Sequence, residues 1–150
     1  MRRSVRRSPD FWTRHYLGYL DRRPDSVAGA LWVIAESRGG ALVHCVAGKD
    51  RTGTVTALAL SVAGVPDEEI VADYAATAER IAKIVERLID VAPYSWGLQG
   101  RSLDEQTPRP ETMATILQTL EEEYGGAAGW LREQGWGTPQ LDLLRSRLVS

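Results

Sequence analysis

The sequence is poor in several residue types that carry chemistry: its 150 residues include one cysteine, two histidines and one phenylalanine. One cysteine cannot form an intramolecular disulfide, so its thiol is free for chemistry and a reducing compartment is expected. His15 and His44 lie far apart and form no zinc-ligand pattern with it. Long apolar runs are missing too, since none approaches the roughly 20 residues that span a bilayer. We therefore expect a cytoplasmic protein without a membrane span, a metal or another cofactor.

The chain also has little excess of either charge, because 18 lysines and arginines face 20 aspartates and glutamates. A net charge this small does not attract nucleic acid over the whole surface, so no nucleic-acid partner is expected. Basic residues gather in residues 1–9, MRRSVRRSP, and no apolar stretch of signal-peptide length follows them. We expect this segment to be a flexible basic tail rather than a contact for anionic lipid or RNA. The length fits a single domain over residues 1–150.

Apolar residues recur at helical spacing through most of the chain, which predicts a largely helical fold. Residues 92–110 have several prolines and glycines and no periodicity, so we expect a long loop there. The predicted helices cover residues 10–22, 24–37, 51–64, 70–91, 111–124, a short segment around Trp130, and 139–148. The longest of them is expected to bury Ile81, Ile84, Val85, Leu88 and Ile89.

Residues 41–45, ALVHC, form a short apolar run that follows two glycines. This pattern predicts a buried strand and an α/β fold with a mainly helical C-terminal part. A lone strand cannot form a sheet, because its backbone donors and acceptors need partners on both sides. We therefore expect the sheet to be incomplete in this chain.

The segment that follows, HCVAGKDRTG over residues 44–53, leads from the predicted strand through a turn into a helix. A glycine-containing loop before a helix start directs several backbone N–H groups toward one point and binds anions. The same donors lower the pKa of a thiol, so Cys45 is expected to ionise readily and act as a nucleophile. Arg51, six residues later, provides a planar fork that holds two phosphate oxygens at once.

The segment has two other possible interpretations. The nucleotide-binding P-loop pattern fails, because Val43 stands where its first glycine belongs and Asp50 stands where serine or threonine belongs. The second is a buried structural cysteine before a helix turn, which is the usual case for a cysteine alone. The neighbouring His44, Arg51 and Thr52 favour phosphate chemistry instead, with Thr52 donating to the sulfur and His44 fixing the loop from outside.

The segment HCVAGKDRTG resembles the signature loop of cysteine-dependent tyrosine and dual-specificity phosphatases, most closely a bacterial branch that also acts on phosphoinositides. The likeness extends to GVPDEEIVADY, RPETM and YGGAAGWLREQGWGTPQLDLLRSRL. It implies a cysteine-phosphatase-like fold, with Cys45 as the nucleophile, Arg51 as the phosphate clamp and Thr52 assisting hydrolysis. It also implies that Lys49 meets a second phosphate or acidic group and that no metal is needed. The implied phosphate cradle is the backbone of Val46, Ala47, Gly48, Lys49, Asp50 and Arg51, supported by His44 and Gly53.

Relatives of this kind carry a glycine-rich stretch and several strands before the part seen here, so the chain is expected to be a partial phosphatase domain. Because that preceding stretch could contain the general acid, the identity of the acid is not determined by this sequence. Asp50 is the best candidate, although orienting Arg51 or capping the next helix would explain it equally well. Asp21 and Asp25 are weaker candidates. Tyr94 and Trp96 are candidate substrate contacts or local packing anchors.

These observations predict a tyrosine-protein phosphatase that acts through a cysteinyl-phosphate intermediate. Its expected substrate is a phosphorylated protein bearing phosphotyrosine, with phosphoserine, phosphothreonine or a phosphoinositide as further options. The alternative is a catalytically impaired fragment or pseudophosphatase that binds phosphate and does not hydrolyse its esters.

Overall fold

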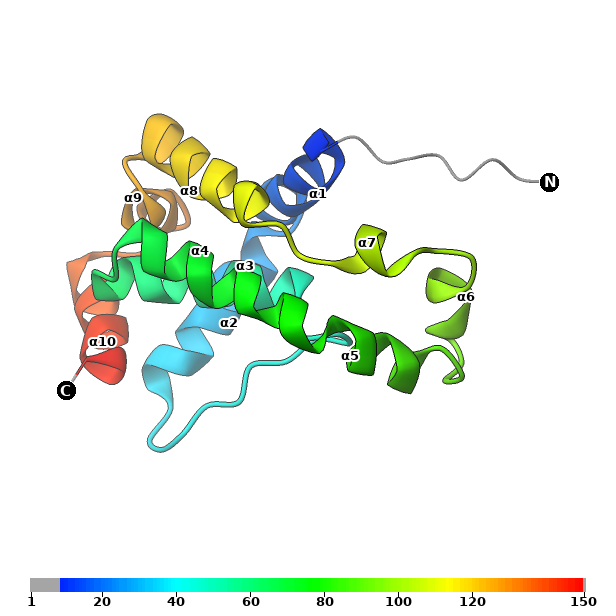
Figure 1. Cartoon of the computed structure of the whole chain (residues 1–150). Helices are drawn as coiled ribbons and strands as arrows, with labels where there is room; N and C mark the ends of the chain where they lie inside the picture. Colours follow the sequence, from blue (N-terminus) through cyan, green and yellow to red (C-terminus); the bar gives the residue numbers. More distant parts are fainter. Residues whose placement is uncertain (1–8, 150) are drawn as a thin grey trace.

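The computed structural model describes residues 9–149, and this part of the chain is built from helices (Figure 1). Most boundaries follow the apolar periodicity and the proline and glycine signals of the sequence. The elements are α1 (Pro9–Arg22), α2 (Pro24–Glu36), α3 (Asp50–Ala63), α4 (Asp67–Ala76), the 3₁₀ turn η1 (Thr77–Arg80), α5 (Ile81–Leu88), α6 (Ser95–Leu98), α7 (Leu103–Gln106), α8 (Pro110–Tyr124), α9 (Ala127–Glu133) and α10 (Thr138–Leu148).

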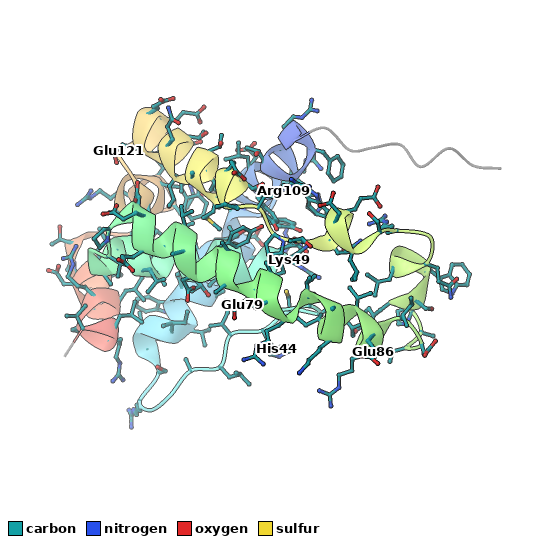
Figure 2. All side chains as sticks on the ribbon, viewed as in Figure 1. His44, Lys49, Glu79, Glu86, Arg109 and Glu121 are labelled. Atoms are coloured by element: carbon teal, nitrogen blue, oxygen red, sulfur yellow. The ribbon has the colours of Figure 1, made fainter. Side chains whose placement is uncertain are left out.

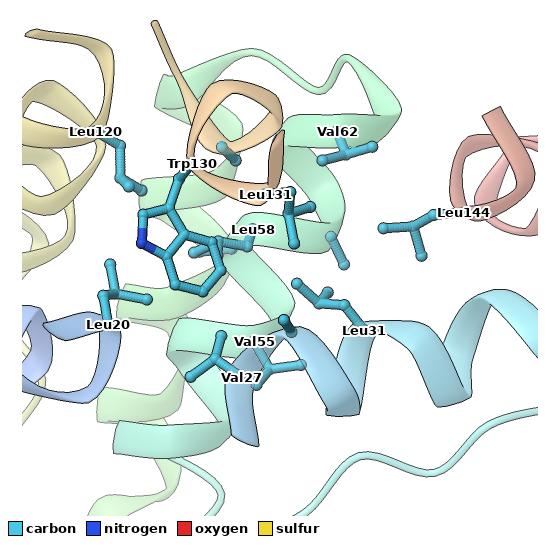
Figure 3. Close-up of a cluster of buried hydrophobic side chains, with 14 of the residues drawn as sticks. Leu20, Val27, Leu31, Val55, Leu58, Val62, Leu120, Trp130, Leu131 and Leu144 are labelled. Carbon is cyan, nitrogen blue, oxygen red and sulfur yellow. The ribbon is translucent and has the colours of Figure 1, made fainter. Parts of the chain in front are cut away.

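The hydrophobic core surrounds α3, which contacts α1, α2, α4, α9 and α10. Figure 3 shows Leu58 of α3 beside the indole of Trp130 from α9, with side chains from α1, α2 and α8 around them. Leu58 is fully buried and Trp130 nearly so. Burying such side chains stabilises the fold by about 1.5–3 kcal/mol each. The core therefore holds α3 firmly, and with it the loop that leads into its first turn.

The predicted strand over residues 41–45 is wrong: within residues 9–149 no strand forms, and this segment is an irregular extended connection between α2 and α3. Leu42, expected to be buried, is 88% exposed. An extended segment becomes a strand only when a neighbour pairs with its backbone, and helices cannot provide that pairing. The α/β expectation is thus not confirmed for the described residues, whereas the helical C-terminal part is.

The single long helix predicted over residues 70–91 is interrupted, since α4, η1 and α5 follow one another along one line (Figure 1). No side chain of η1 is fully buried, and this turn takes the tighter 3₁₀ form. Of the five residues predicted as its buried side, Ile81 is buried. Ile84, Val85, Leu88 and Ile89 are half-buried.

The predicted loop over residues 92–110 contains two one-turn helices, α6 and α7. Ser102 begins α7 with a capping box, because its hydroxyl accepts from the Glu105 N–H and the Glu105 carboxylate accepts from the Ser102 N–H. Ser102 and Glu105 form a helix-start pattern that can be read from the sequence. It was missed because the segment has no apolar periodicity. The segment carries the chain from the end of α5 back to α8 (Figure 1).

The predicted basic tail lies outside the described residues, except that Pro9 already begins α1. Among residues 9–149, no helix combines the length and apolar character that crossing a membrane requires.

Candidate active site

The loop over residues 44–49 curls immediately before α3, and Cys45 lies at its beginning. Gly48 has a φ of +66°, a left-handed conformation that permits the curl and that other residues rarely adopt. Burial alone would raise the pKa of the Cys45 thiol. Backbone N–H groups of Thr52, Gly48 and Lys49 all favour the ionised sulfur, and the net effect is a pKa below the ordinary value. Amides of the loop and of the first turn of α3 therefore lie close to this sulfur.

The Thr52 hydroxyl also favours the Cys45 thiolate and contributes to its lowered pKa. Its oxygen is buried and has no hydrogen-bond partner of good geometry among the described residues. A buried hydroxyl without another partner is available to donate to the sulfur as negative charge develops there. This arrangement suits the predicted role of Thr52.

Cys45 and Arg51 line the same cavity, of about 490 Å³. Its remaining walls come from α1, α2, α3 and the extended segment before the loop. Arg51 is exposed, whereas Cys45 is half-buried. An exposed guanidinium beside a half-buried sulfur can meet a ligand that arrives from solvent. The cavity is lined by Tyr19, Arg23, Ser26, Val27, Ala30, Val43, His44, Cys45, Arg51, Thr52, Thr54 and Val55.

Lys49 lies in the interior, with its side chain 3% exposed, and Figure 2 shows it near the centre of the molecule. Its Nζ atom donates to the backbone oxygen of Gln106 over 2.7 Å. The same atom lies 4.5 Å from the centroid of the Trp12 ring. Burial lowers the pKa of Lys49, which Asp50 partly opposes. The predicted contact with a second phosphate would require this buried side chain to move toward solvent.

Asp50 begins α3 and takes part in a chain of tyrosine hydroxyls. The Tyr16 hydroxyl donates to Oδ1 of Asp50 and lies 2.9 Å from the Tyr74 hydroxyl. Lys49 Nζ lies 3.5 Å from the same Oδ1 atom. The Asp50 side chain is 25% exposed, so it touches solvent while one of its oxygens is held from within.

The other predicted loop residues form its rim and its base. Val46 is exposed, as is His44, whose ring lies toward the outside of the molecule in Figure 2. Ala47 is half-buried. Gly53 packs under the loop: a Cβ atom there would lie 3.0 Å from Cδ2 of Tyr74. A side chain at this position would require the Tyr74 ring to shift by a few tenths of an ångström.

The weaker acid candidates lie elsewhere. Asp25 accepts two hydrogen bonds from Arg23, which hold the pKa of that carboxyl below its usual range. Asp21 is exposed near the end of α1. Tyr94 and Trp96 are 39% and 87% exposed, outside the residues that line the Cys45 cavity.

Sequence reasoning missed the aromatic face of α1. Trp12, Tyr16 and Tyr19 follow helical spacing and face Lys49, Asp50 and the Cys45 cavity respectively. Burial raises the pKa of Tyr19 to about 12, with Asp50 adding to the effect and Arg51 opposing it. The three-to-four-residue aromatic spacing was readable in the sequence, but it is also typical of ordinary core packing.

Comparison with known proteins shows the family of this chain. The model of the tyrosine phosphatase family matches residues 2–150, and the chain belongs to that family. It is similar to a tyrosine-protein phosphatase of Nostoc commune, 32% identical over 126 residues that cover 77% of this chain and 41% of the relative. It is also similar to the triple specificity protein phosphatase PtpB of Mycobacterium tuberculosis, 34% identical over 119 residues that cover 72% of this chain and 43% of the relative.

The chain thus spans less than half the length of the curated relatives it matches. Within the described part of the chain, no cluster of three or more histidine, cysteine, aspartate or glutamate side chains has the arrangement of a metal site.

Proposed function

We propose that this chain carries the catalytic loop of a protein-tyrosine phosphatase that hydrolyses phosphate monoesters through a cysteinyl-phosphate intermediate. The observation that carries the proposal is that Cys45 and Arg51 line one cavity, with the Thr52 hydroxyl and the amides of Thr52, Gly48 and Lys49 placed to lower the pKa of the Cys45 thiol. Donors that stabilise a thiolate also bind the phosphoryl oxygens close to it. One loop thereby activates the nucleophile and holds the substrate.

In the first step, Cys45 Sγ attacks phosphorus, and an S–P bond forms as the bond to the leaving oxygen breaks. Asp50 gives its proton to that oxygen. In the second step, a water molecule attacks phosphorus, the S–P bond breaks and its electron pair returns to sulfur. Asp50 takes a proton from the water, and the Thr52 hydroxyl donates to the departing thiolate. Arg51 binds the equatorial oxygens in both steps.

The test is hydrolysis of p-nitrophenyl phosphate by the purified chain. Cys45→Ser is expected to abolish turnover while phosphate binding survives, and Arg51→Lys to lower kcat by about 100-fold or more, because an ammonium cannot make the paired contacts. Rapid acid quenching with ³²P-labelled substrate should trap label on the parent chain and none on Cys45→Ser. Undiminished turnover by Cys45→Ser would refute the mechanism.

Phosphotyrosine in a protein is the first substrate we propose, with phosphoserine, phosphothreonine and phosphoinositides as further options. One relative is named a tyrosine-protein phosphatase and the other a triple specificity protein phosphatase. A panel of matched phosphopeptides and a soluble phosphoinositide separates these options. Selective hydrolysis of the phosphotyrosine peptide is expected, since Lys49, the basic residue proposed for a second phosphate, is bonded to Gln106.

A phosphate-binding module without full catalytic power is the second candidate. The exposed segment around Leu42, which pairs with no strand in the described residues, favours it. Aryl phosphates with good leaving groups need little acid assistance. Activity confined to p-nitrophenyl phosphate would favour this candidate, whereas hydrolysis of phosphotyrosine peptides at comparable efficiency would favour a complete enzyme.

A further inference from the structure

We infer that Tyr16, supported by Tyr74, is a positioning residue for Asp50: it holds one carboxyl oxygen, so that the other carries the proton passed to the leaving group. The inference rests on the proposed phosphatase function and adds to it two residues from outside the loop. Tyr16 comes from α1 and Tyr74 from α4, so neither belongs to the loop or to α3.

The direction of the hydrogen bonds follows from the number of protons. Each phenol has one hydrogen, and the Tyr16 hydroxyl donates its own to Oδ1 of Asp50. The contact of 2.9 Å between the two hydroxyls must then have Tyr74 as donor and Tyr16 as acceptor. Tyr74 thus donates to Tyr16, and Tyr16 donates to a single oxygen of the Asp50 carboxyl group.

Burial keeps both donors in their protonated form. Tyr16 is 1% exposed and Tyr74 is 6% exposed. Burial raises the pKa of Tyr16 far above its usual range and that of Tyr74 to about 12, with Asp50 adding to both effects. At neutral pH the Asp50 carboxyl therefore always faces a hydroxyl that donates, never a phenolate.

Both inner contacts of the carboxyl fall on the same atom, since Lys49 Nζ also approaches Oδ1. An oxygen that accepts from Tyr16 and faces an ammonium is the less favourable place for the acidic hydrogen, because its lone pairs already meet donors. The hydrogen of the protonated carboxyl is consequently assigned to Oδ2. When Oδ2 releases it to the leaving oxygen, the negative charge that remains is stabilised by donors already in place.

The test measures kcat/KM over a series of aryl phosphates whose leaving groups run from p-nitrophenol, which needs little protonation, to phenol, which needs much. Tyr16→Phe removes one oxygen atom and keeps the ring. We expect a change within about twofold for p-nitrophenyl phosphate and a loss of about tenfold or more for phenyl phosphate. Asp50→Asn should show the same trend more steeply, and Tyr74→Phe the same trend more weakly. Tyr124→Phe, a change of the same kind at the far end of α8, is the matched control and should leave every rate unchanged.

The double variant Tyr16→Phe with Asp50→Asn separates positioning from folding. If Tyr16 acts through Asp50, the double variant is no slower on phenyl phosphate than Asp50→Asn alone. Equal losses on all leaving groups, or losses that multiply in the double variant, would overturn the inference. If Tyr16→Phe does not fold, Tyr74→Phe provides the same comparison. A parent chain with no hydrolysis dependent on Cys45 would refute the proposed function instead, so the two failures are distinguishable.

Discussion

Lys49 Nζ donates a hydrogen bond over 2.7 Å to the backbone oxygen of Gln106, which lies 57 positions further along the chain. Lys49 is the last residue before α3, and Gln106 is the last residue of α7. One buried side chain thus joins the candidate phosphate loop to the segment between α5 and α8. The ring of Trp12 beneath the ammonium adds α1 to the same junction.

The first prediction concerns this junction. Lys49→Met keeps an unbranched side chain of similar length and removes the charge and the donor. A hydrogen bond to a charged group is worth about 1.5–3 kcal/mol, so local opening of α7 should rise by about 10- to 100-fold. The midpoint of global unfolding should change little, because methionine packs well where a charge was costly to bury.

Hydrogen exchange over residues 103–107 is the measurement, since the Thr107 N–H bonds to Leu103 and Asp104 within α7. Lys83→Met is the matched control, because Lys83 is an exposed lysine of α5. Unaltered exchange in Lys49→Met would mean that other contacts hold α7 in place.

The sequence was informative where structure depends on neighbours along the chain. Apolar periodicity and helix stop signals located most of the helices, because these signals act within a few residues. The strand over residues 41–45 could not be judged in the same way. An apolar run becomes a strand only if a distant segment pairs with it, and local sequence carries no record of that partner.

The same distinction between local and long-range contacts applies to the candidate site. Spacing within HCVAGKDRTG predicted that Cys45 and Arg51 belong to one site, and both line the same cavity, since they occupy one turn and one helix start. The partners of Asp50 were not predictable: Tyr16 is 34 residues away, and Tyr74 reaches Asp50 through Tyr16. Long-range contacts of this kind depend on how α1, α3 and α4 pack.

The second prediction tests the environment of the nucleophile. The pKa of the Cys45 thiol is below its ordinary value of 9.0, so its thiolate is present at lower pH than in a free cysteine. The rate of alkylation by iodoacetamide should therefore reach half its maximum below that pH. Thr52→Val, which removes the hydroxyl and keeps the shape, should move this midpoint upward.

Thr56→Val is the matched control for that measurement, because Thr56 belongs to α3 and does not line the Cys45 cavity. Its midpoint should equal that of the parent chain. A midpoint that stays in place in Thr52→Val would assign the lowered pKa to the backbone amides alone.

The third prediction concerns stability at high pH. Tyr19 and Tyr74 have pKa values raised to about 12 from the ordinary 10.0, first of all by burial, and the pKa of Tyr16 is raised as well. Above pH 10 the unfolded chain has therefore lost phenolic protons that the folded chain keeps. The state that binds more protons loses relative stability as pH rises, so the free energy of unfolding falls.

Urea unfolding from about pH 8 to about pH 11 measures this fall. Tyr74→Phe should reduce the slope between the two pKa values by at most about 1.4 kcal/mol per pH unit. The absorbance of tyrosinate should appear at a higher pH in the folded chain than in the chain unfolded by urea. Coincident titration curves in the two states would contradict the prediction.

The fourth prediction compares two glycines that both lie inside helices. A Cβ at Gly53 would lie 3.0 Å from Cδ2 and 3.2 Å from Cε2 of Tyr74, whereas one at Gly29 of α2 would meet nothing within 4 Å. Alanine favours a helix over glycine by about 1 kcal/mol, and overpacking costs about 1–3 kcal/mol. Gly29→Ala should therefore stabilise the chain in urea unfolding, and Gly53→Ala should destabilise it. Because the added methyl group pushes the Tyr74 ring away from α3, Gly53→Ala should also reproduce the leaving-group dependence of Tyr74→Phe.

A Gly53→Ala chain as stable as Gly29→Ala would mean that the ring moves without cost, and that Tyr74 does not hold Tyr16 in place.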